Sequence, residues 1–92
     1  MKALAEIQVI PIGSGISVRD EVMRAHDLIK SSGLKVQLHA YGTNVEGDMD
    51  TILTAVKRVH ESLHEHGTMR LVTILKLGTR QDKEPSLDDR SR

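Results

Sequence analysis

The 92-residue sequence contains no cysteine, no phenylalanine and no tryptophan, and Tyr41 is its single tyrosine. The absence of cysteine excludes a disulfide framework and a thiolate metal site. With no large aromatic side chains except Tyr41, the core must be aliphatic, and a surface that stacks on single-stranded nucleic acid is not expected. A small aliphatic core favours burial of further apolar surface between subunits, so we expect self-association.

An excess of charge of either sign is also lacking, because 13 Lys and Arg residues balance 13 Asp and Glu residues. Nucleic-acid binding generally requires a basic surplus or a basic patch, so we expect no nucleic-acid partner. No apolar run approaches the roughly 20 residues that span a bilayer. Polar residues interrupt the first ten positions, unlike the core of a signal peptide. These features predict a cytoplasmic protein with no membrane association.

Alternating apolar and polar residues indicate four β-strands. One face of the strand predicted for residues 3–10 is entirely apolar, with Ala3, Ala5, Ile7 and Val9. Residues 34–40 and 43–47 predict two further strands, joined by a turn at Tyr41-Gly42. The fourth strand is predicted for residues 70–77. Pro11 is expected to end the first strand, because proline cannot donate a hydrogen bond to a neighbouring strand.

Two segments have the apolar spacing of amphipathic helices. The first is expected to begin at Ser17, as the N-cap of a capping box with Asp20, and to stop at Gly33. The second is expected to begin at Asp48 and to stop at Gly67. Its apolar stripe consists of Met49, Ile52, Val56, Val59 and Leu63.

The resulting order βαββαβ predicts an α+β, ferredoxin-like fold, in which two helices cover one face of a four-stranded antiparallel sheet. A single domain over residues 1–78 accounts for all six elements. Residues 79–92 are polar and of mixed charge, and we interpret them as a C-terminal tail that is mobile or ordered by a partner.

The face of the sheet without helices is expected to carry polar side chains from three strands. These are Glu6, Gln8, Lys35, Gln37, His39, Asn44 and Glu46, with Leu4 and Ile10 at the edges. A solvated surface explains any one of them. Carboxylates, amides and a histidine inside an apolar rim are, as a set, typical of a small-molecule site. The carboxylates favour a cationic or amine-bearing ligand, to which Tyr41 could add a cation–π contact.

Two short motifs carry weaker signals. His60-Glu61-Ser62-Leu63-His64 matches the H-E-x-x-H pattern of zinc hydrolases. The pattern lies at a helix end, where histidine also complements the helix dipole, and no third ligand has a supporting spacing. Gly13-Ser14-Gly15 is similar to a phosphate-binding loop but matches no full fingerprint, so we interpret it as an ordinary loop. We predict no metal site, no cofactor and no catalytic residue.

Several motifs along the chain point to one family. They are Glu6 with Val9-Ile10-Pro11-Ile12-Gly13, the Thr-x-x-Glu-Gly element within residues 41–48, Gly67 with Arg70, and Arg80 with Asp82. Together they resemble the small thiamine-binding-protein family of the MTH1187/YkoF-like type, formerly the uncharacterised UPF0045/DUF77 family. The resemblance spans about residues 3–83.

The resemblance implies a ferredoxin-like fold, homodimers or homotetramers formed by sheet contacts, and non-enzymatic binding of thiamine or its hydroxymethylpyrimidine moiety. It also implies that Glu6, Thr43 and Glu46 lie near the pocket. These residues, combined with those expected on the face of the sheet without helices, form the predicted ligand-binding set. The set consists of Glu6, Gln8, His39, Tyr41, Thr43, Asn44 and Glu46. The alternatives are an oligomerisation module without a small ligand and, less favoured, a zinc hydrolase that uses His60 and His64.

Overall fold

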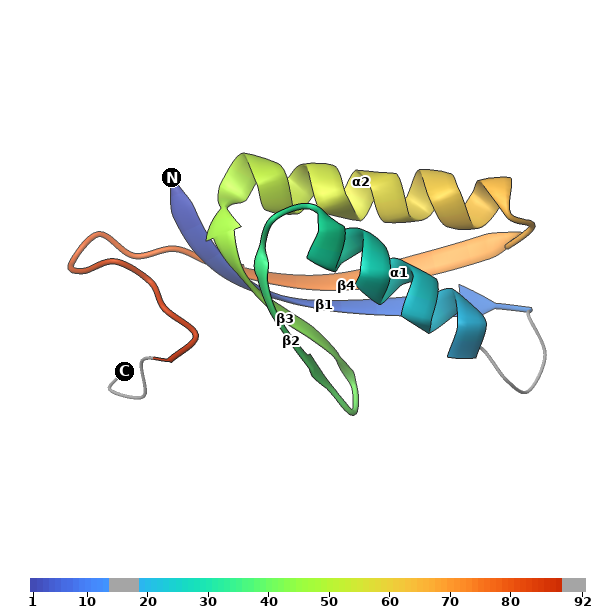
Figure 1. Cartoon of the computed structure of the whole chain (residues 1–92), viewed down its shortest axis with the longest axis horizontal. Helices are drawn as coiled ribbons and strands as arrows, with labels where there is room; N and C mark the ends of the chain where they lie inside the picture. Colours follow the sequence, from blue (N-terminus) through green and yellow to red (C-terminus); the bar gives the residue numbers. More distant parts are fainter. Residues whose placement is uncertain (14–18, 89–92) are drawn as a thin grey trace.

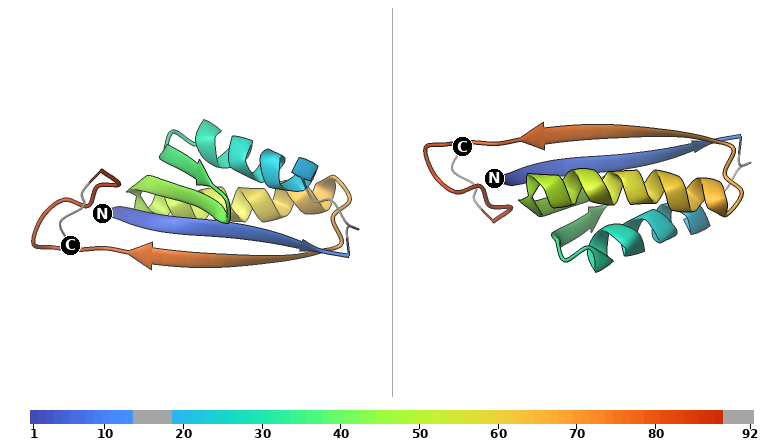
Figure 2. Two further views of the ribbon diagram at one scale, coloured as in Figure 1. Left: turned by 90° about the horizontal axis from the view of Figure 1, so that it is seen from below. Right: turned by 90° about the horizontal axis from the view of Figure 1, so that it is seen from above.

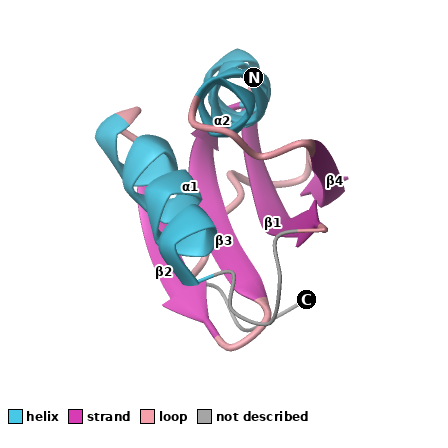
Figure 3. Ribbon diagram, turned by 90° about the vertical axis from the view of Figure 1, so that its right-hand side faces the viewer, coloured by secondary structure: helices cyan, strands magenta, loops and turns pink. Residues whose placement is uncertain are grey.

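The computed structural model describes residues 1–13 and 19–88 (Figure 1). Its elements are β1 (Lys2–Ile12), α1 (Arg19–Ser31), β2 (Lys35–His39), β3 (Gly42–Asp48), α2 (Met49–Glu65) and β4 (Arg70–Gly78). The strands form one antiparallel sheet in the order β2-β3-β1-β4. Both helices lie on the same face of this sheet (Figure 3). The predicted ferredoxin-like fold is therefore confirmed.

The hydrophobic core lies between the helices and the covered face of the sheet. Ala3, Ala5 and Ile7 of β1 are at most 7% exposed, as the alternation predicts. From α2, Ile52, Val59 and Leu63 are at most 1% exposed, and Val56 and Met49 pack against them. Full burial of one such aliphatic side chain contributes about 1.5–3 kcal/mol, so these residues supply much of the stability.

Helix α2 begins and ends where the sequence predicts. The Asp48 side chain accepts a hydrogen bond from the Asp50 amide at 3.1 Å, which makes Asp48 the N-cap. The Met1 amine also donates to Asp48, at 3.0 Å, and this bond lowers the pKa of the Asp48 carboxyl. Gly67, just after α2, has a φ of 105°, which favours glycine. The predicted N-cap Ser17 of the first helix lies outside the described residues.

Strand β1 continues through Pro11, so the prediction that Pro11 ends it is wrong. Pro11 pairs with Leu71 of β4. Pairing of β1 with β3 ends at Ile7, so β1 has a single neighbouring strand from Gln8 onward. Proline is tolerated at such an edge, because its missing N–H can face away from the neighbouring strand.

The β2–β3 hairpin extends beyond the layer of helices (Figure 1). Val36, near the middle of β2, packs against the core. Leu38 follows it on the same face but is 49% exposed, because it lies close to the end of the hairpin. The alternation thus predicts the face of each side chain correctly but not the depth of burial near the turn. No helix of the described residues is long and apolar enough to cross a membrane.

After β4 the chain turns back at the end of the sheet, where the N-terminus also lies (Figure 2). The described part of this segment, residues 79–88, contacts the sheet. Pro85 is buried, and the Leu87 amide donates a hydrogen bond of 2.8 Å to Oε1 of Glu46. Lys35 forms an ion pair with Asp88. Part of the segment predicted as a polar tail therefore packs against the domain.

Candidate functional site

The open face of the sheet, opposite the helices, brings polar side chains of three strands side by side. Glu6 of β1 is paired with Asn44 of β3, and Asn44 is paired in turn with Gln37 of β2. His39 lies two residues after Gln37 and therefore on the same face. Strand register and alternation place these groups within reach of one another.

Glu6, His39 and Asn44 form a connected cluster on this face. Nε2 of His39 lies 3.1 Å from Oδ1 of Asn44 and 3.4 Å from Oε2 of Glu6. The Tyr41 amide donates to Nδ1 of His39 at 3.3 Å, so Nδ1 accepts and Nε2 carries the hydrogen. The histidine thereby fixes the orientation of the Asn44 amide.

This cluster leaves a donor and an acceptor for a ligand. Since Oδ1 of Asn44 accepts from His39, the Asn44 amide nitrogen is the group that remains to donate. The Glu6 side chain is 38% exposed, and Nζ of Lys76 lies 3.8 Å from its Oε1. A carboxylate with two oxygens can accept further hydrogen bonds beside these contacts.

A cavity of about 650 Å³ adjoins the cluster. The sheet side of its lining consists of Leu4, Ala5, Glu6, Asn44 and Lys76. The remaining lining residues are Gly78, which ends β4, and Thr79, Arg80, Pro85, Ser86 and Leu87, which follow it. Small-molecule sites typically measure about 300–1,000 Å³, so this cavity has the volume of a ligand site.

The residues after β4 were missed by the sequence prediction, which treated them as a tail. The available signal was Pro85 and Leu87, two apolar residues in an otherwise polar segment. Arg80 stabilises the turn that leads to them. Its Nε donates to Oδ1 of Asp82 at 2.6 Å, and its Nη2 donates to Oδ2 of the same carboxylate. The guanidinium lowers the pKa of the Asp82 carboxyl to about 2.

The seven predicted ligand-binding residues do not all line one cavity. Glu6 and Asn44 line the cavity of about 650 Å³, and His39 contacts both of them. A second hollow of about 200 Å³ lies under α1, and its lining includes Gln8, His39, Tyr41 and Thr43. Glu46 is not among the described residues that line either space.

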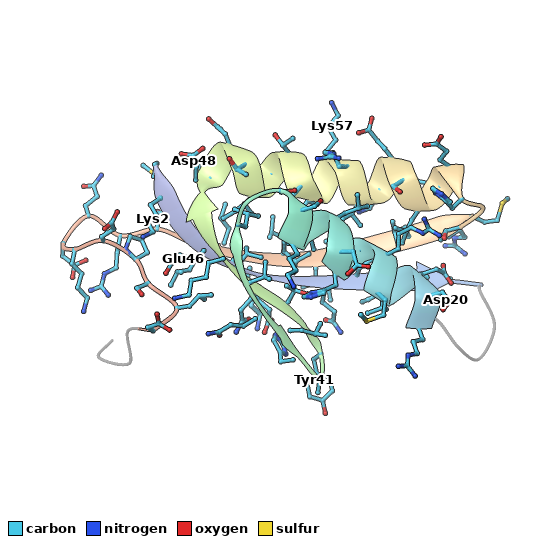
Figure 4. The ribbon with its side chains drawn as sticks, in the orientation of Figure 1. Lys2, Asp20, Tyr41, Glu46, Asp48 and Lys57 are labelled. Atoms are coloured by element: carbon cyan, nitrogen blue, oxygen red, sulfur yellow. The ribbon has the colours of Figure 1, made fainter. Side chains whose placement is uncertain are left out.

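Thr43 and Tyr41 lie away from the polar cluster. Thr43 precedes Asn44 and therefore points to the covered face, where it is 4% exposed, with its Oγ1 3.5 Å from Nδ1 of His26. Tyr41 is 78% exposed at the tip of the hairpin and points away from the body of the molecule (Figure 4). Glu46 lies near the segment after β4, with which it shares the hydrogen bond from Leu87 (Figure 4).

The histidines of the H-E-x-x-H motif each have a partner within the domain. Nε2 of His60 lies 2.7 Å from Oγ1 of Thr73, and Nδ1 of His64 donates to the Thr68 carbonyl at 2.8 Å. Within residues 1–13 and 19–88, no group of three or more His, Cys, Asp or Glu residues could hold a metal ion. The histidine contacts therefore connect α2 to β4 and to the loop that precedes it.

The family model described as "Thiamine-binding protein" matches residues 5–92. The chain belongs to the thiamine-binding protein family. The predicted family resemblance is thereby confirmed. The family description names binding and states no reaction.

Three relatives place the chain within this family. A UPF0045 protein of Synechocystis is 38% identical over 90 residues, which cover 98% of this chain and 74% of the relative. The crystal structure of the hypothetical protein MJ1052 from Methanocaldococcus jannaschii has a TM-score of 0.88 and 40% identity, covering 95% of this chain and 89% of that one. The crystal structure of a candidate thiamine biosynthesis or salvage protein from Thermotoga maritima has a TM-score of 0.78 and 26% identity. The match covers 87% of this chain and 85% of that one.

Proposed function

We propose that the protein is a cytoplasmic, non-enzymatic binding protein for thiamine or its hydroxymethylpyrimidine moiety, and that it acts as a homo-oligomer. Membership of the thiamine-binding protein family supports the ligand class. One observation supports the location of the site: Glu6 is paired with Asn44 at the wall of a cavity of about 650 Å³.

The groups at this wall complement an aminopyrimidine. The edge of such a ring presents an exocyclic amine, which donates, next to a ring nitrogen, which accepts. The Glu6 carboxylate is an acceptor, and the Asn44 amide nitrogen, oriented through His39, is a donor. Because Glu6 and Asn44 are directly paired across two strands, one ring edge can reach both. The negative charge of Glu6 also favours the positively charged thiazolium ring of thiamine.

The two cavities near the predicted ligand-binding residues differ in volume. The hollow under α1 measures about 200 Å³, which is below the range of about 300–1,000 Å³ for typical ligand sites. The cavity beside Glu6 measures about 650 Å³ and has apolar walls at Leu4, Pro85 and Leu87. Two heterocyclic rings need this larger space and apolar walls against which to pack, so we place the ligand there.

Isothermal titration calorimetry of the purified protein with thiamine tests whether thiamine is the ligand. We expect saturable binding of about one thiamine per chain, because each chain has one cavity beside the paired Glu6 and Asn44. Absence of binding at any tested concentration would favour the oligomerisation module instead.

Exposed apolar residues on the open face support self-association. Val72 and Ile74 of β4 are 45% and 46% exposed. They pair with Ile10 and Gln8, which lie further along β1 than the cavity-lining Leu4, Ala5 and Glu6. A second copy that packs its open face here would bury these side chains and leave the cavity end accessible.

The substitution Ile74→Glu tests this surface. A buried, unpaired carboxylate in the subunit contact is expected to weaken association at least tenfold. Sedimentation velocity would then show monomers at concentrations at which the unsubstituted protein assembles. The matched control is Leu53→Glu on α2, where an equally exposed leucine (43%) lies on the other side of the molecule. Equal assembly of both variants would remove the open face from the subunit contact.

A further inference from the structure

Five of the eleven residues that line the cavity come from the segment after β4, which we call the strap and define as residues 79–88. The strap leaves the end of β4, turns back, and meets the sheet near the start of β1 and the end of β3 (Figures 1 and 2). A ligand enclosed between the sheet and the strap has the strap as its outer wall.

Polar contacts connect the strap to the sheet at several points. The Leu87 amide donates a hydrogen bond of 2.8 Å to Oε1 of Glu46, whose side chain is 12% exposed. Lys35 pairs with Asp88, and both side chains are largely exposed. Nζ of Lys2 lies 3.7 Å from the Glu84 carboxylate, which is also exposed. Exposed ion pairs contribute little, so the hydrogen bond to Glu46 is the strongest of these polar contacts.

We propose that the strap is a gate over the ligand cavity, and that Glu46 holds the gate closed through the Leu87 amide. This inference rests on the proposed function, because it concerns the entry of the same ligand. It gives the two carboxylates of the open face separate roles. Glu6 contacts the ligand, whereas Glu46 acts on the ligand through the strap.

The cost of opening is small compared with that of unfolding the domain. The contacts that opening breaks include the Leu87–Glu46 hydrogen bond, two exposed ion pairs and the packing of Pro85, whereas the pairing between β4 and β1 stays intact. Segments with few buried contacts open locally while the rest of a protein stays folded. The gate can therefore open while the sheet side of the site, with Glu6 and Asn44, stays in place.

A first experiment needs no ligand and measures hydrogen exchange at the Leu87 amide. The full-length protein is compared with Glu46→Ala and Glu46→Gln. We expect exchange at least tenfold faster in Glu46→Ala, because the acceptor is lost, and a smaller increase in Glu46→Gln, whose amide oxygen still accepts. Amides in the middle of β1 serve as internal controls and should keep their protection. Equal exchange at Leu87 in all three proteins would overturn the role of Glu46.

A second experiment closes the gate covalently. Because the chain has no cysteine, the double substitution Lys35→Cys and Asp88→Cys introduces two unique thiols where the two side chains meet. A short bismaleimide then connects the strap to β2. Each single-cysteine variant, treated with the same reagent, is the matched control. Association and dissociation rates of thiamine are measured by surface plasmon resonance before and after the reaction.

The possible outcomes distinguish a failure of the gate proposal from a failure of the proposed function. We expect the cross-link to slow thiamine association at least tenfold, with no such change in the single-cysteine controls. Unchanged association in the cross-linked protein would overturn the gate and leave thiamine binding intact. If the untreated protein does not bind thiamine at all, the proposed function fails, and the exchange of the Leu87 amide still decides whether Glu46 holds the strap.

Discussion

Replacing Glu6 by glutamine is expected to raise the dissociation constant for thiamine about 10- to 100-fold, the equivalent of a hydrogen bond to a charged group. The substitution preserves the shape of the side chain and removes its charge. It therefore weakens the hydrogen bond from an exocyclic amine and the attraction of a thiazolium ring together. Lys76, 3.8 Å from the carboxylate, would also lose its ionic partner, an effect that exposure makes small.

The matched control for this substitution is Glu65→Gln. Glu65 is an exposed carboxylate at the end of α2, on the other face of the sheet. Calorimetric titrations of both variants should give an unchanged affinity for Glu65→Gln, and thermal denaturation should show that both remain folded. An unchanged affinity of Glu6→Gln would remove Glu6 from the site.

Replacing Gly42 by alanine is expected to destabilise the protein by about 1–3 kcal/mol, the usual cost of overpacking. A Cβ atom at Gly42 would lie 2.7 Å from the main-chain oxygen of Ile7. Because the contact is with backbone, the clash can be relieved only by moving β3 away from β1. The same movement would separate Asn44 from Glu6, so the affinity for thiamine should fall as well.

Gly78→Ala provides the comparison for stability. A Cβ atom at Gly78 has its nearest neighbour, the Leu4 oxygen, at 4.0 Å, which is ordinary contact. Urea denaturation followed by circular dichroism should show a change of less than about 0.5 kcal/mol for this variant. If the two alanine variants were equally stable, the close approach of β1 and β3 at Gly42 would not be a constraint.

The alternation of side chains explains why sequence reasoning brought the members of the polar cluster together. A period of two residues fixes the face on which each side chain lies, and it correctly placed Glu6, His39 and Asn44 together. The same rule separates Thr43 from Asn44, because neighbouring residues in a strand point to opposite faces. Thr43 entered the predicted set through the family resemblance, and the structure places it under α1.

The strap could not be predicted because nothing local determines its position. Residues 79–88 have neither helical nor strand periodicity, and their placement depends on contacts with residues far away in the sequence, such as Glu46 and Lys35. The prediction that Pro11 ends β1 failed for a related reason. Its effect depends on whether a second strand pairs with β1 at that point, and this is a property of the assembled sheet.

The measurement that tests the account most directly is a calorimetric titration with hydroxymethylpyrimidine, in parallel with the thiazole half of thiamine. If the edge of the aminopyrimidine meets Glu6 and Asn44, the pyrimidine half should bind saturably at about one per chain, and Glu6→Gln should weaken this binding as it weakens that of thiamine. Binding of the thiazole half alone, or pyrimidine binding that Glu6→Gln leaves unchanged, would contradict the assignment of this wall as the recognition site.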